Sequence, residues 1–333
     1  MSRIGVLGAG SWGMALAKML AETGNETAVW THSPEKLDAY RSTRRHPNLD
    51  CELPESLIYE KDLGRICTGK DILVTAVPSV HIRTVMHEAA PDIPDGQIIV
   101  NVSKGIESST LMTMTDIIGD EMKRCGKAAR TVALSGPTHA EEVVAGLPST
   151  IVSSSADMSA AEYVQDVFMN PSMRVYTNED LLGIELCGAM KNIIAIAAGI
   201  CIGIGYGDNS KAALITRGLA EITRLGLAMG CRRETFAGLA GMGDLIVTAT
   251  SRHSRNNRAG YYIGQGLSAE EARKKVGMVV EGINALPAIL ALAEKYGIEL
   301  PICEAVDAII SRGADTKETV NGLMMRGKKN ERF

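Results

Sequence analysis

Residues 4–20 read IGVLGAGSWGMALAKML and place a glycine-rich turn between two apolar segments. The first segment, Ile4–Leu7, predicts a short buried strand, and the second predicts a helix. The glycines have the spacing GxGxxG. Gly8 permits a tight turn, Gly10 lets the backbone touch a pyrophosphate, and Gly13 allows the helix to pack closely on the strand. Because a helix N-terminus offers unpaired N–H groups to phosphates, the turn predicts a dinucleotide site. The alternative is a βα turn that binds nothing.

Further apolar runs extend this pattern through the first half of the chain. Asp71–Val77 (DILVTAV) and Gln97–Val102 (QIIVNV) are apolar without alternation, which is typical of strands buried on both faces. The shorter candidate strands are Ala28–Thr31, Thr131–Leu134, Ser149–Ser153 and Arg174–Tyr176. Helical stretches separate them, and Ser159 with Glu162 predicts a capping box before the run AAEYVQDVF. The alternation predicts an α/β fold with a Rossmann-type, doubly wound, mostly parallel sheet.

The second half of the chain has a different character. From Leu181 onward apolar residues recur at helical spacing, and strand-like runs are almost absent. The clearest helices are Leu214–Leu227, Ala269–Val276, Ala285–Lys295 and Glu304–Ile310. Ser268 with Glu271 predicts a capping box for the second of these. We therefore predict a dinucleotide-binding domain over residues 1–180 and an all-helical substrate-binding domain over residues 181–333.

Composition restricts the possible partners of the chain. Its 333 residues are 45% hydrophobic, and 35 Lys+Arg against 39 Asp+Glu give a net charge of −4, which argues against a nucleic-acid binder. The 7 cysteines are odd in number and contain no CxxC, so neither a disulfide framework nor a zinc site is expected. This cysteine usage favours a reducing cytoplasm.

Neither a signal peptide nor a membrane span is expected. The N-terminus MSRIGVLGAG lacks a basic region followed by a long apolar core, so it predicts a first strand. The longest stretch without charged or strongly polar side chains, Ile193–Gly207, is shorter than the about 20 residues that a span needs. It predicts a buried helix and the turn after it.

The residues after the second strand bear on the choice of dinucleotide. An NAD-selective site places Asp or Glu about 20 residues after the glycines to hold the ribose 2′-hydroxyl. His32 and Ser33 stand there instead, and Glu35 and Asp38 lie further on, inside the next helix. Without a carboxylate a 2′-phosphate is not repelled. Basic residues that attract it, or that form only a solvated face, are Arg41, Arg44 and Arg45. We predict NADPH, or the use of both cofactors.

Lys191 stands with Asn192 in the middle of an almost uniformly apolar stretch, Glu185–Ile200. A helix that is apolar on all sides is buried. Burial of an ammonium group costs several kcal/mol or lowers its pKa from about 10.4 toward working pH. We predict that Lys191 is a general acid–base at the domain junction. The alternative is a lysine whose head reaches the surface.

An arginine and amide cluster follows a glycine-dense segment. Ser251–Arg258 (SRHSRNNR) contains no acid and can receive a dianion through arginine and amide donors, or form a basic loop that binds nothing. Before it, Gly238–Asp244 (GLAGMGD) allows close approach of its backbone to a ligand, or is a flexible loop. Asp244 is expected to orient Lys191 or a substrate hydroxyl, or to cap a helix.

Taken together, these segments resemble the bacterial-type NAD(P)-dependent glycerol-3-phosphate dehydrogenase family. The matching motifs occur in the family's order over nearly the whole chain and are GAGSWGMALA, NVSKGIE, ALSGPTHAEEV, ELCGAMKNIIAIAAGI, GLAGMGDLIVTATSRHSRNNRAG and VVEGINA. The resemblance implies a C-terminal domain similar to that of 6-phosphogluconate dehydrogenase. It also implies reversible reduction of dihydroxyacetone phosphate to sn-glycerol 3-phosphate, the backbone precursor of phospholipids.

The same resemblance implies roles for individual residues. Lys191 is implied as the catalytic acid–base, and Lys104 as a contact to both cofactor and substrate. The other implied substrate contacts are Gly136, Thr138, Asp244, Ser254, Arg255 and Asn256. The implied cofactor contacts beyond the three glycines are Ser11, Trp12, His32, Ser33, Ala140, Arg255, Val279 and Glu281. Ser33 departs from the many relatives that carry arginine there, which bears on NADPH preference. No metal is expected, because Lys191 can polarise the carbonyl.

Two other functions remain as alternatives at this point. A β-hydroxyacid or 6-phosphogluconate-type dehydrogenase shares the order of a sheet followed by helices, but requires a substrate carboxylate. A non-catalytic dinucleotide sensor would have little use for a buried lysine or an Arg/Asn patch. A GxSxG elbow for acyl transfer is absent from the sequence. The small-residue helices favour a homodimer.

Overall fold

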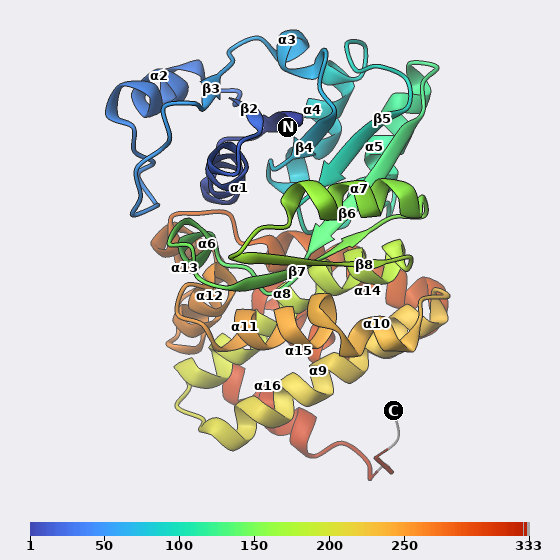
Figure 1. Ribbon diagram of the computed structural model, residues 1–333. Helices are drawn as coiled ribbons and strands as arrows, with labels where there is room; N and C mark the ends of the chain where they lie inside the picture. Colours follow the sequence, from blue (N-terminus) through green and yellow to red (C-terminus); the bar gives the residue numbers. More distant parts are fainter. Residues whose placement is uncertain (329, 332–333) are drawn as a thin grey trace. The chain divides into compact units, whose positions relative to one another are not determined.

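The computed structural model describes residues 1–328 and 330–331, which form two compact units (Figure 1). The sheet unit consists of Met1–Ser103 and Met112–Leu181. The helical unit consists of Lys104–Leu111 and the chain from Leu182 onward. The short segment Lys104–Leu111 thus leaves the sheet unit and returns to it, an excursion that no sequence pattern indicated.

The described part of the sheet unit forms one eight-stranded sheet in the order β3-β2-β1-β4-β5-β6-β7-β8. Its strands are β1 (Arg3–Leu7), β2 (Glu26–Trp30), β3 (Ile58–Tyr59), β4 (Ile72–Thr75), β5 (Gln97–Asn101), β6 (Ala129–Ser135), β7 (Ser149–Ser154) and β8 (Met173–Asn178). Neighbouring strands are parallel, except for the antiparallel pair β6–β7. The predicted mostly parallel α/β sheet is confirmed. The two-residue strand β3 was not predicted.

Helices cover both faces of this sheet (Figure 1). They are α1 (Ser11–Glu22), α2 (Pro34–Thr43), α3 (Leu63–Cys67), α4 (Ile82–Ala89), α5 (Met114–Arg124), α6 (Ala140–Val144) and α7 (Met158–Phe168), with a 3₁₀ turn at Ser79–His81. Side chains alternate across each strand. Ile4 and Val6 therefore belong to the core cluster that includes residues of α1 and α7, whereas Leu7 belongs to the cluster that includes residues of α4 and α5. This doubly wound arrangement brings the strand ends that follow β1, β2 and β4 to one edge.

The predicted capping box at Ser159 is wrong. Helix α7 begins at Met158, and its N-cap is Asp157, whose Oδ1 accepts from the backbone N–H of Ser159 at 3.1 Å. Arg130 donates to Asp157 Oδ2 at 2.7 Å and so holds the carboxylate in place. An aspartate fixed by a distant arginine therefore outcompetes the local S-x-x-E pattern. The predicted box of Ser268 and Glu271 is confirmed in α13.

In the helical unit the long helix α8 (Leu181–Gly203) is central. By length and composition it is apolar enough to cross a membrane, but all its residues from Gly183 to Cys201 are buried within the protein. The predicted buried helix is confirmed. The other elements are α9 (Asp208–Ala228), α10 (Arg233–Ala237), a π-helical turn (Leu239–Gly243), α11 (Asp244–Thr250), α12 (Arg255–Gly264), α13 (Ala269–Val276), α14 (Glu281–Tyr296), α15 (Pro301–Arg312) and α16 (Thr316–Met324). Among the described residues beyond Asn178, none forms a strand.

Helices α8 and α12 touch through their backbones, because glycines stand at the crossing. A Cβ on Gly199 would lie 2.0 Å from a backbone oxygen of α12, and one on Gly260 would lie 2.0 Å from a backbone oxygen of α8. Gly203 and Gly264 repeat this arrangement one turn later, at 2.4 Å in each case. Real Cβ atoms do not approach that closely, so any side chain would force the two helices apart.

Replacement of Gly260 by alanine is expected to lower the free energy of unfolding by about 3 kcal/mol, the upper range for overpacking of a well-packed core. Gly322→Ala is the matched control, since Gly322 lies in α16 and a methyl group there would meet nothing within 4 Å. Alanine at this position is expected to be neutral or slightly stabilising. Denaturant melts of both variants check this. Equal stability of the two variants would contradict the close contact.

Candidate functional site

The glycine-rich turn between β1 and α1 needs glycine at two positions for steric reasons. Gly8 has φ +123°, and a Cβ there would lie 2.6 Å from the carbonyl oxygen of Ala76. A Cβ on Gly13 would lie 2.0 Å from the carbonyl oxygen of Gly8, so this glycine allows the helix to pack against the turn. Gly10 differs, because a Cβ there would meet nothing within 4 Å. The strand, turn and helix predicted from the spacing are confirmed.

The first turn of α1 fits an anionic ligand. Gly10 is its N-cap and supplies no side-chain hydrogen bond, so the N–H groups of the first turn are not capped by it. The Ser11 hydroxyl is buried and has no hydrogen-bond partner among the described residues. Trp12 follows, partly buried against the core. An uncapped helix start beside an unpartnered buried hydroxyl is the chemistry that binds a pyrophosphate.

The segment after β2 carries the residues predicted to select the dinucleotide. His32 is exposed, and Ser33 is the N-cap of α2 without a side-chain cap hydrogen bond. Among the predicted basic residues, Arg44 forms ion pairs with Glu52 at 3.4 Å and Glu55 at 2.6 Å. Arg44 therefore holds the segment after α2 in place. Because its guanidinium group is already paired with carboxylates, Arg44 is a poor phosphate ligand.

Three predicted residues follow β6. A Cβ on Gly136 would lie 3.0 Å from the Cα atom of Ile151, so glycine relieves crowding against β7. Thr138 donates its hydroxyl proton to the carbonyl oxygen of Gly136 at 3.2 Å. Ala140 is the first residue of α6, a helix that packs against α1. The fold thus brings Ala140 to the helix that begins at the glycine-rich turn.

A buried ionic cluster lies in the helical unit. Lys191 Nζ lies 2.5 Å from Asp244 Oδ1, and Lys104 Nζ lies 2.5 Å from Asp244 Oδ2. Lys191 also donates to the Thr248 hydroxyl at 2.7 Å. The side chains of Asp244 and Lys191 are 1% and 8% exposed, so the lysine head does not reach the surface. The contact places Asp244 where it can orient Lys191, one of the roles predicted for it.

Burial and neighbouring charges set the protonation of this cluster. Burial lowers the pKa of Lys191 to about 7; Asp244 acts in the opposite direction, and Lys104 lowers the pKa further. Burial acts to raise the pKa of Asp244, but the two ammonium groups outweigh it and hold that pKa below its usual value. Asp244 is therefore ionised near neutral pH, and Lys191 exchanges a proton in the physiological range.

The backbone around the cluster explains how its members meet. Asp244 begins α11 directly after the π-helical turn Leu239–Gly243, and a Cβ on Gly241 would lie 2.1 Å from the carbonyl oxygen of Phe236. The glycine-dense segment is therefore a packed helical turn and not a flexible loop. Gly188 on α8 leaves space for Lys104, since a Cβ there would lie 3.2 Å from the Lys104 Cγ.

Two residues of the candidate site, Thr248 and Asn192, were not among the site residues predicted from the sequence. Thr248 lies one helical turn after Asp244 on α11, and this i, i+4 spacing places both on one helix face. Asn192, next to Lys191, accepts from Asn256 Nδ2 at 2.9 Å. The i, i+4 spacing was a usable signal for Thr248. The pairing of Asn192 with a residue of another helix had no local signal.

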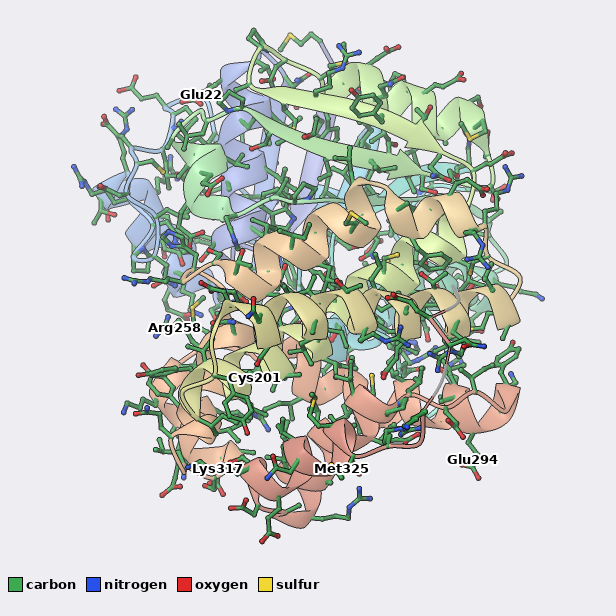
Figure 2. The ribbon with its side chains drawn as sticks, turned by 90° about the horizontal axis from the view of Figure 1, so that it is seen from below. Glu22, Cys201, Arg258, Glu294, Lys317 and Met325 are labelled. Atoms are coloured by element: carbon green, nitrogen blue, oxygen red, sulfur yellow. The ribbon has the colours of Figure 1, made fainter. Side chains whose placement is uncertain are left out.

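The arginine and amide cluster forms the start of α12. Ser254 is the N-cap, and its hydroxyl accepts from the Asn257 N–H at 3.2 Å. Asn256 is buried and its Oδ1 accepts from the Gly282 N–H at 2.9 Å. Arg255 is half-buried at the first helical position, one turn before Arg258, which Figure 2 labels. The segment is therefore ordered, and is not a loose basic loop.

The remaining predicted residues, Val279 and Glu281, are both half-buried, and Glu281 begins α14. Gly282, which donates to Asn256, directly follows Glu281. The segment with two predicted cofactor residues is thus hydrogen-bonded to a predicted substrate residue within the helical unit.

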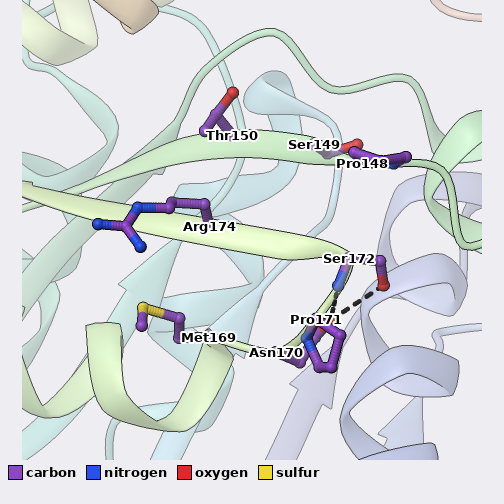
Figure 3. Close-up of a pocket in the computed structure, with 8 residues that line it drawn as sticks. All are labelled: Pro148, Ser149, Thr150, Met169, Asn170, Pro171, Ser172 and Arg174. Atoms are coloured by element: carbon purple, nitrogen blue, oxygen red, sulfur yellow. Dashed lines mark hydrogen bonds between the residues drawn. The ribbon is translucent and has the colours of Figure 1, made fainter.

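A surface pocket of about 400 Å³ lies elsewhere in the sheet unit (Figure 3). It is lined by Pro148, Ser149, Thr150, Met169, Asn170, Pro171, Ser172 and Arg174. Asn170 Oδ1 accepts from the Ser172 N–H at 2.9 Å and from its hydroxyl at 3.0 Å, so its carbonyl is used within the turn. None of these residues is a predicted site residue, and we assign the pocket no role.

Comparisons with known proteins cover nearly the whole chain. The model for the N-terminus of NAD-dependent glycerol-3-phosphate dehydrogenase matches residues 3–161, and the model for its C-terminus matches residues 180–321. Glycerol-3-phosphate dehydrogenase [NAD(P)+] 2 of Lactobacillus delbrueckii subsp. bulgaricus is 60% identical over 99% of both chains. The corresponding protein of Fusobacterium nucleatum is 49% identical, again over 99% of both chains. A crystal structure of glycerol-3-phosphate dehydrogenase from Coxiella burnetii aligns with a TM-score of 0.91 at 35% identity, covering 98% of this chain and 99% of that one.

Proposed function

This chain belongs to the NAD-dependent glycerol-3-phosphate dehydrogenase family, and on that premise we propose that it interconverts dihydroxyacetone phosphate and sn-glycerol 3-phosphate. It is an oxidoreductase that uses NADH or NADPH. The observation that carries the chemistry is the buried cluster of Lys191, Asp244 and Lys104. The family assignment removes the β-hydroxyacid alternative, and a sensor has no use for an acid–base lysine. The product is a phospholipid precursor, so we propose that the reaction supplies phospholipid synthesis.

Lys191 holds the proton that reduction delivers to the carbonyl oxygen. The nicotinamide, when bound, supplies the hydride that adds to the carbonyl carbon. An ammonium group has three N–H donors. Asp244 and Thr248 accept two of them, and the third is available to the substrate oxygen. With one carboxylate between two lysines, the cluster carries a net positive charge when both are protonated, which stabilises the alkoxide as it forms.

The start of α12 is proposed to bind the phosphate of the substrate. The guanidinium group of Arg255 can donate two parallel hydrogen bonds to phosphate oxygens, and Asn256 adds an amide donor. Asn256 is oriented in advance by its contacts with Asn192 and Gly282. Binding energy from the phosphate then holds the carbonyl in place for the reaction. Ser254, Gly136 and Thr138 complete the proposed substrate contacts.

The glycine-rich turn is proposed to bind the dinucleotide pyrophosphate, on the evidence of the uncapped start of α1 and the unpartnered Ser11 hydroxyl. We propose a preference for NADPH over NADH. Its support is the lack of a carboxylate at His32 and Ser33, and the ion pair that Asp38 forms with Lys61 at 2.7 Å, which offsets the charge of one of the two acids of α2.

The remaining proposals concern domain roles, assembly and location. We propose that residues 1–180 bind the cofactor and residues 181–333 bind the substrate. We propose a homodimer, in which Met242 and Ile246, 41% and 45% exposed, would be apolar surface available to a second copy. All seven cysteines are free, which supports a reducing cytoplasm.

The direct test is oxidation of NADPH or NADH, followed by nicotinamide absorbance, with dihydroxyacetone phosphate as substrate. Turnover is expected with both cofactors, with the higher kcat/KM for NADPH. 6-Phosphogluconate and β-hydroxyacids, assayed in the oxidative direction, are the controls and are expected to be inactive. Turnover of a control substrate alone would contradict the proposed reaction, and a higher kcat/KM with NADH would contradict the cofactor preference.

A further inference from the structure

Asn101, the last residue of β5, is 1% exposed although it is polar. Its side chain holds the main chain of Ser103. Asn101 Oδ1 accepts from the Ser103 N–H at 3.0 Å, and Asn101 Nδ2 donates to the Ser103 carbonyl oxygen at 2.9 Å. One carboxamide therefore pairs with both main-chain polar groups of the residue two positions further along the chain. The proposed reaction gives Asn101 no role so far.

Strand β4 and the residues after it hold both partners of this contact. The Thr75 hydroxyl, at the end of β4, donates to Asn101 Oδ1 at 3.3 Å. The Ser103 hydroxyl donates to the Val77 carbonyl oxygen at 2.5 Å. The Val102 N–H donates to the Thr75 carbonyl oxygen at 3.1 Å, which extends the pairing of β4 with β5 by one residue. Ser103 is therefore held both through its main chain and through its side chain.

The main chain of Lys104 starts from this restrained residue. The chain over residues 102–105 is irregular, so its course depends on individual contacts and not on a helix or strand. The Ser103 carbonyl group lies in the peptide plane whose other end is the Lys104 Cα atom. By donating to that carbonyl oxygen, Asn101 restricts rotation of the plane. It thereby restrains the position from which the Lys104 side chain extends.

The Lys104 side chain needs a defined starting point because it ends in the buried ionic cluster. Its Nζ lies 2.5 Å from Asp244 Oδ2, while Lys191 Nζ lies 2.5 Å from the other oxygen of the same carboxylate. A lysine stem has four carbons, so holding its head in one geometry costs rotamer entropy. Freedom of the main chain at Lys104 would add to that cost. A fixed Ser103–Lys104 peptide therefore favours the ion pair with Asp244.

We propose that Asn101 is a positioning residue of the reaction, whose carboxamide fixes the Ser103–Lys104 peptide so that the lysine head is placed in the buried cluster. The inference rests on the proposed function, because it takes the cluster of Lys191, Asp244 and Lys104 as the place of the reaction. Asn101 acts through the main chain and does not itself touch the substrate.

The test begins with Asn101→Leu, since leucine has the branched shape of asparagine but forms no hydrogen bond. The kcat/KM for dihydroxyacetone phosphate is expected to fall about 10- to 100-fold, up to the cost of a misplacement of about 1 Å. The pH at which the kcat for reduction falls is expected to move upward by about one unit, because Lys104 lowers the pKa of Lys191 and a displaced Lys104 lowers it less.

Gln97→Leu is the matched control, because it replaces another buried amide of β5 with leucine at the opposite end of the strand. Gln97 is 7% exposed, and its Nε2 donates to the Asp71 carbonyl oxygen at 3.1 Å. Gln97→Leu is expected to lower the Tm, as Asn101→Leu does, but to leave kcat/KM and the pH profile at their wild-type values. Equal losses of activity in the two variants would mean that Asn101 acts only on stability, which overturns the proposal.

A double-mutant cycle with Lys104→Met determines whether Asn101 acts through Lys104. Once methionine has removed the ammonium group, addition of Asn101→Leu is expected to change kcat/KM by less than about twofold. Two effects that multiply would show that Asn101 acts independently of Lys104, and the proposal would fail. If Asn101→Leu does not fold, Asn101→Ala removes the same amide without adding apolar bulk, and the same results are expected of it.

Activity of the wild type separates failure of this inference from failure of the proposed function. If the wild type reduces dihydroxyacetone phosphate and Asn101→Leu keeps both its kcat/KM and its pH profile, the positioning role alone is overturned. If the wild type reduces dihydroxyacetone phosphate with neither NADPH nor NADH, the proposed function itself fails, and this inference fails with it.

Discussion

Replacement of Lys191 by methionine is expected to lower kcat for dihydroxyacetone phosphate reduction by about 10³-fold, within the range for loss of a general acid. Methionine has a similar length and keeps the apolar packing of α8, but it carries no proton. Asp244 retains its ion pair with Lys104 at 2.5 Å, so the buried carboxylate is not left without a partner. Steady-state kinetics at saturating substrate and cofactor measure the effect.

The pH dependence provides an independent readout of the same residue. Burial lowers the pKa of Lys191 to about 7, and the acid must be protonated to act in reduction. The wild-type kcat for reduction is therefore expected to fall as the pH rises through about 7, and the kcat for oxidation is expected to rise. The methionine variant is expected to lose this dependence. A variant that kept a tenth or more of wild-type turnover would rule out Lys191 as the acid.

The second large effect is expected at Arg255, where alanine is predicted to raise the KM for dihydroxyacetone phosphate by about 10- to 100-fold, since a hydrogen bond to a charged group contributes about 1.5–3 kcal/mol. Arg252→Ala is the matched control, because Arg252 lies in the same basic segment but is exposed. It is expected to leave KM near the wild-type value. Substrate titrations of both variants at saturating cofactor check this.

Unphosphorylated dihydroxyacetone separates phosphate binding from other effects of Arg255. If Arg255 acts on the phosphate, kcat/KM for this poor substrate is expected to be the same in the wild type and in Arg255→Ala. A cofactor defect or a distorted α12 would lower turnover of both substrates alike. An unchanged KM for the phosphorylated substrate would instead mean that its phosphate binds elsewhere.

The order of elements could be predicted from sequence because it depends on local patterns. The GxGxxG turn, the apolar strands and the buried stretch around Lys191 each follow from residues close together in the chain. The capping box at Ser268 was predicted for the same reason. These patterns determine which segment forms which element, and the strand–turn–helix at residues 4–20 contains the proposed pyrophosphate site.

Contacts between distant residues could not be predicted in this way. Lys104 directly follows a segment of the sheet unit, yet it pairs with Asp244, 140 residues further along the chain. The N-cap at Asp157 depends on Arg130, 27 residues earlier. In each case a tertiary partner decided the outcome, and no local window contains that partner.

The backbone contact between α8 and α12 at their glycines also affects which interior residues can be substituted during evolution. Lys191 and Asn192 lie on one of these helices, and Arg255 and Asn256 lie on the other. Main-chain atoms alone set the distance between α8 and α12 at the crossing. That distance therefore does not depend on the size of any side chain. The aliphatic residues around the crossing can therefore change in size and shape, while the relative positions of the proposed acid–base and phosphate-binding groups are kept.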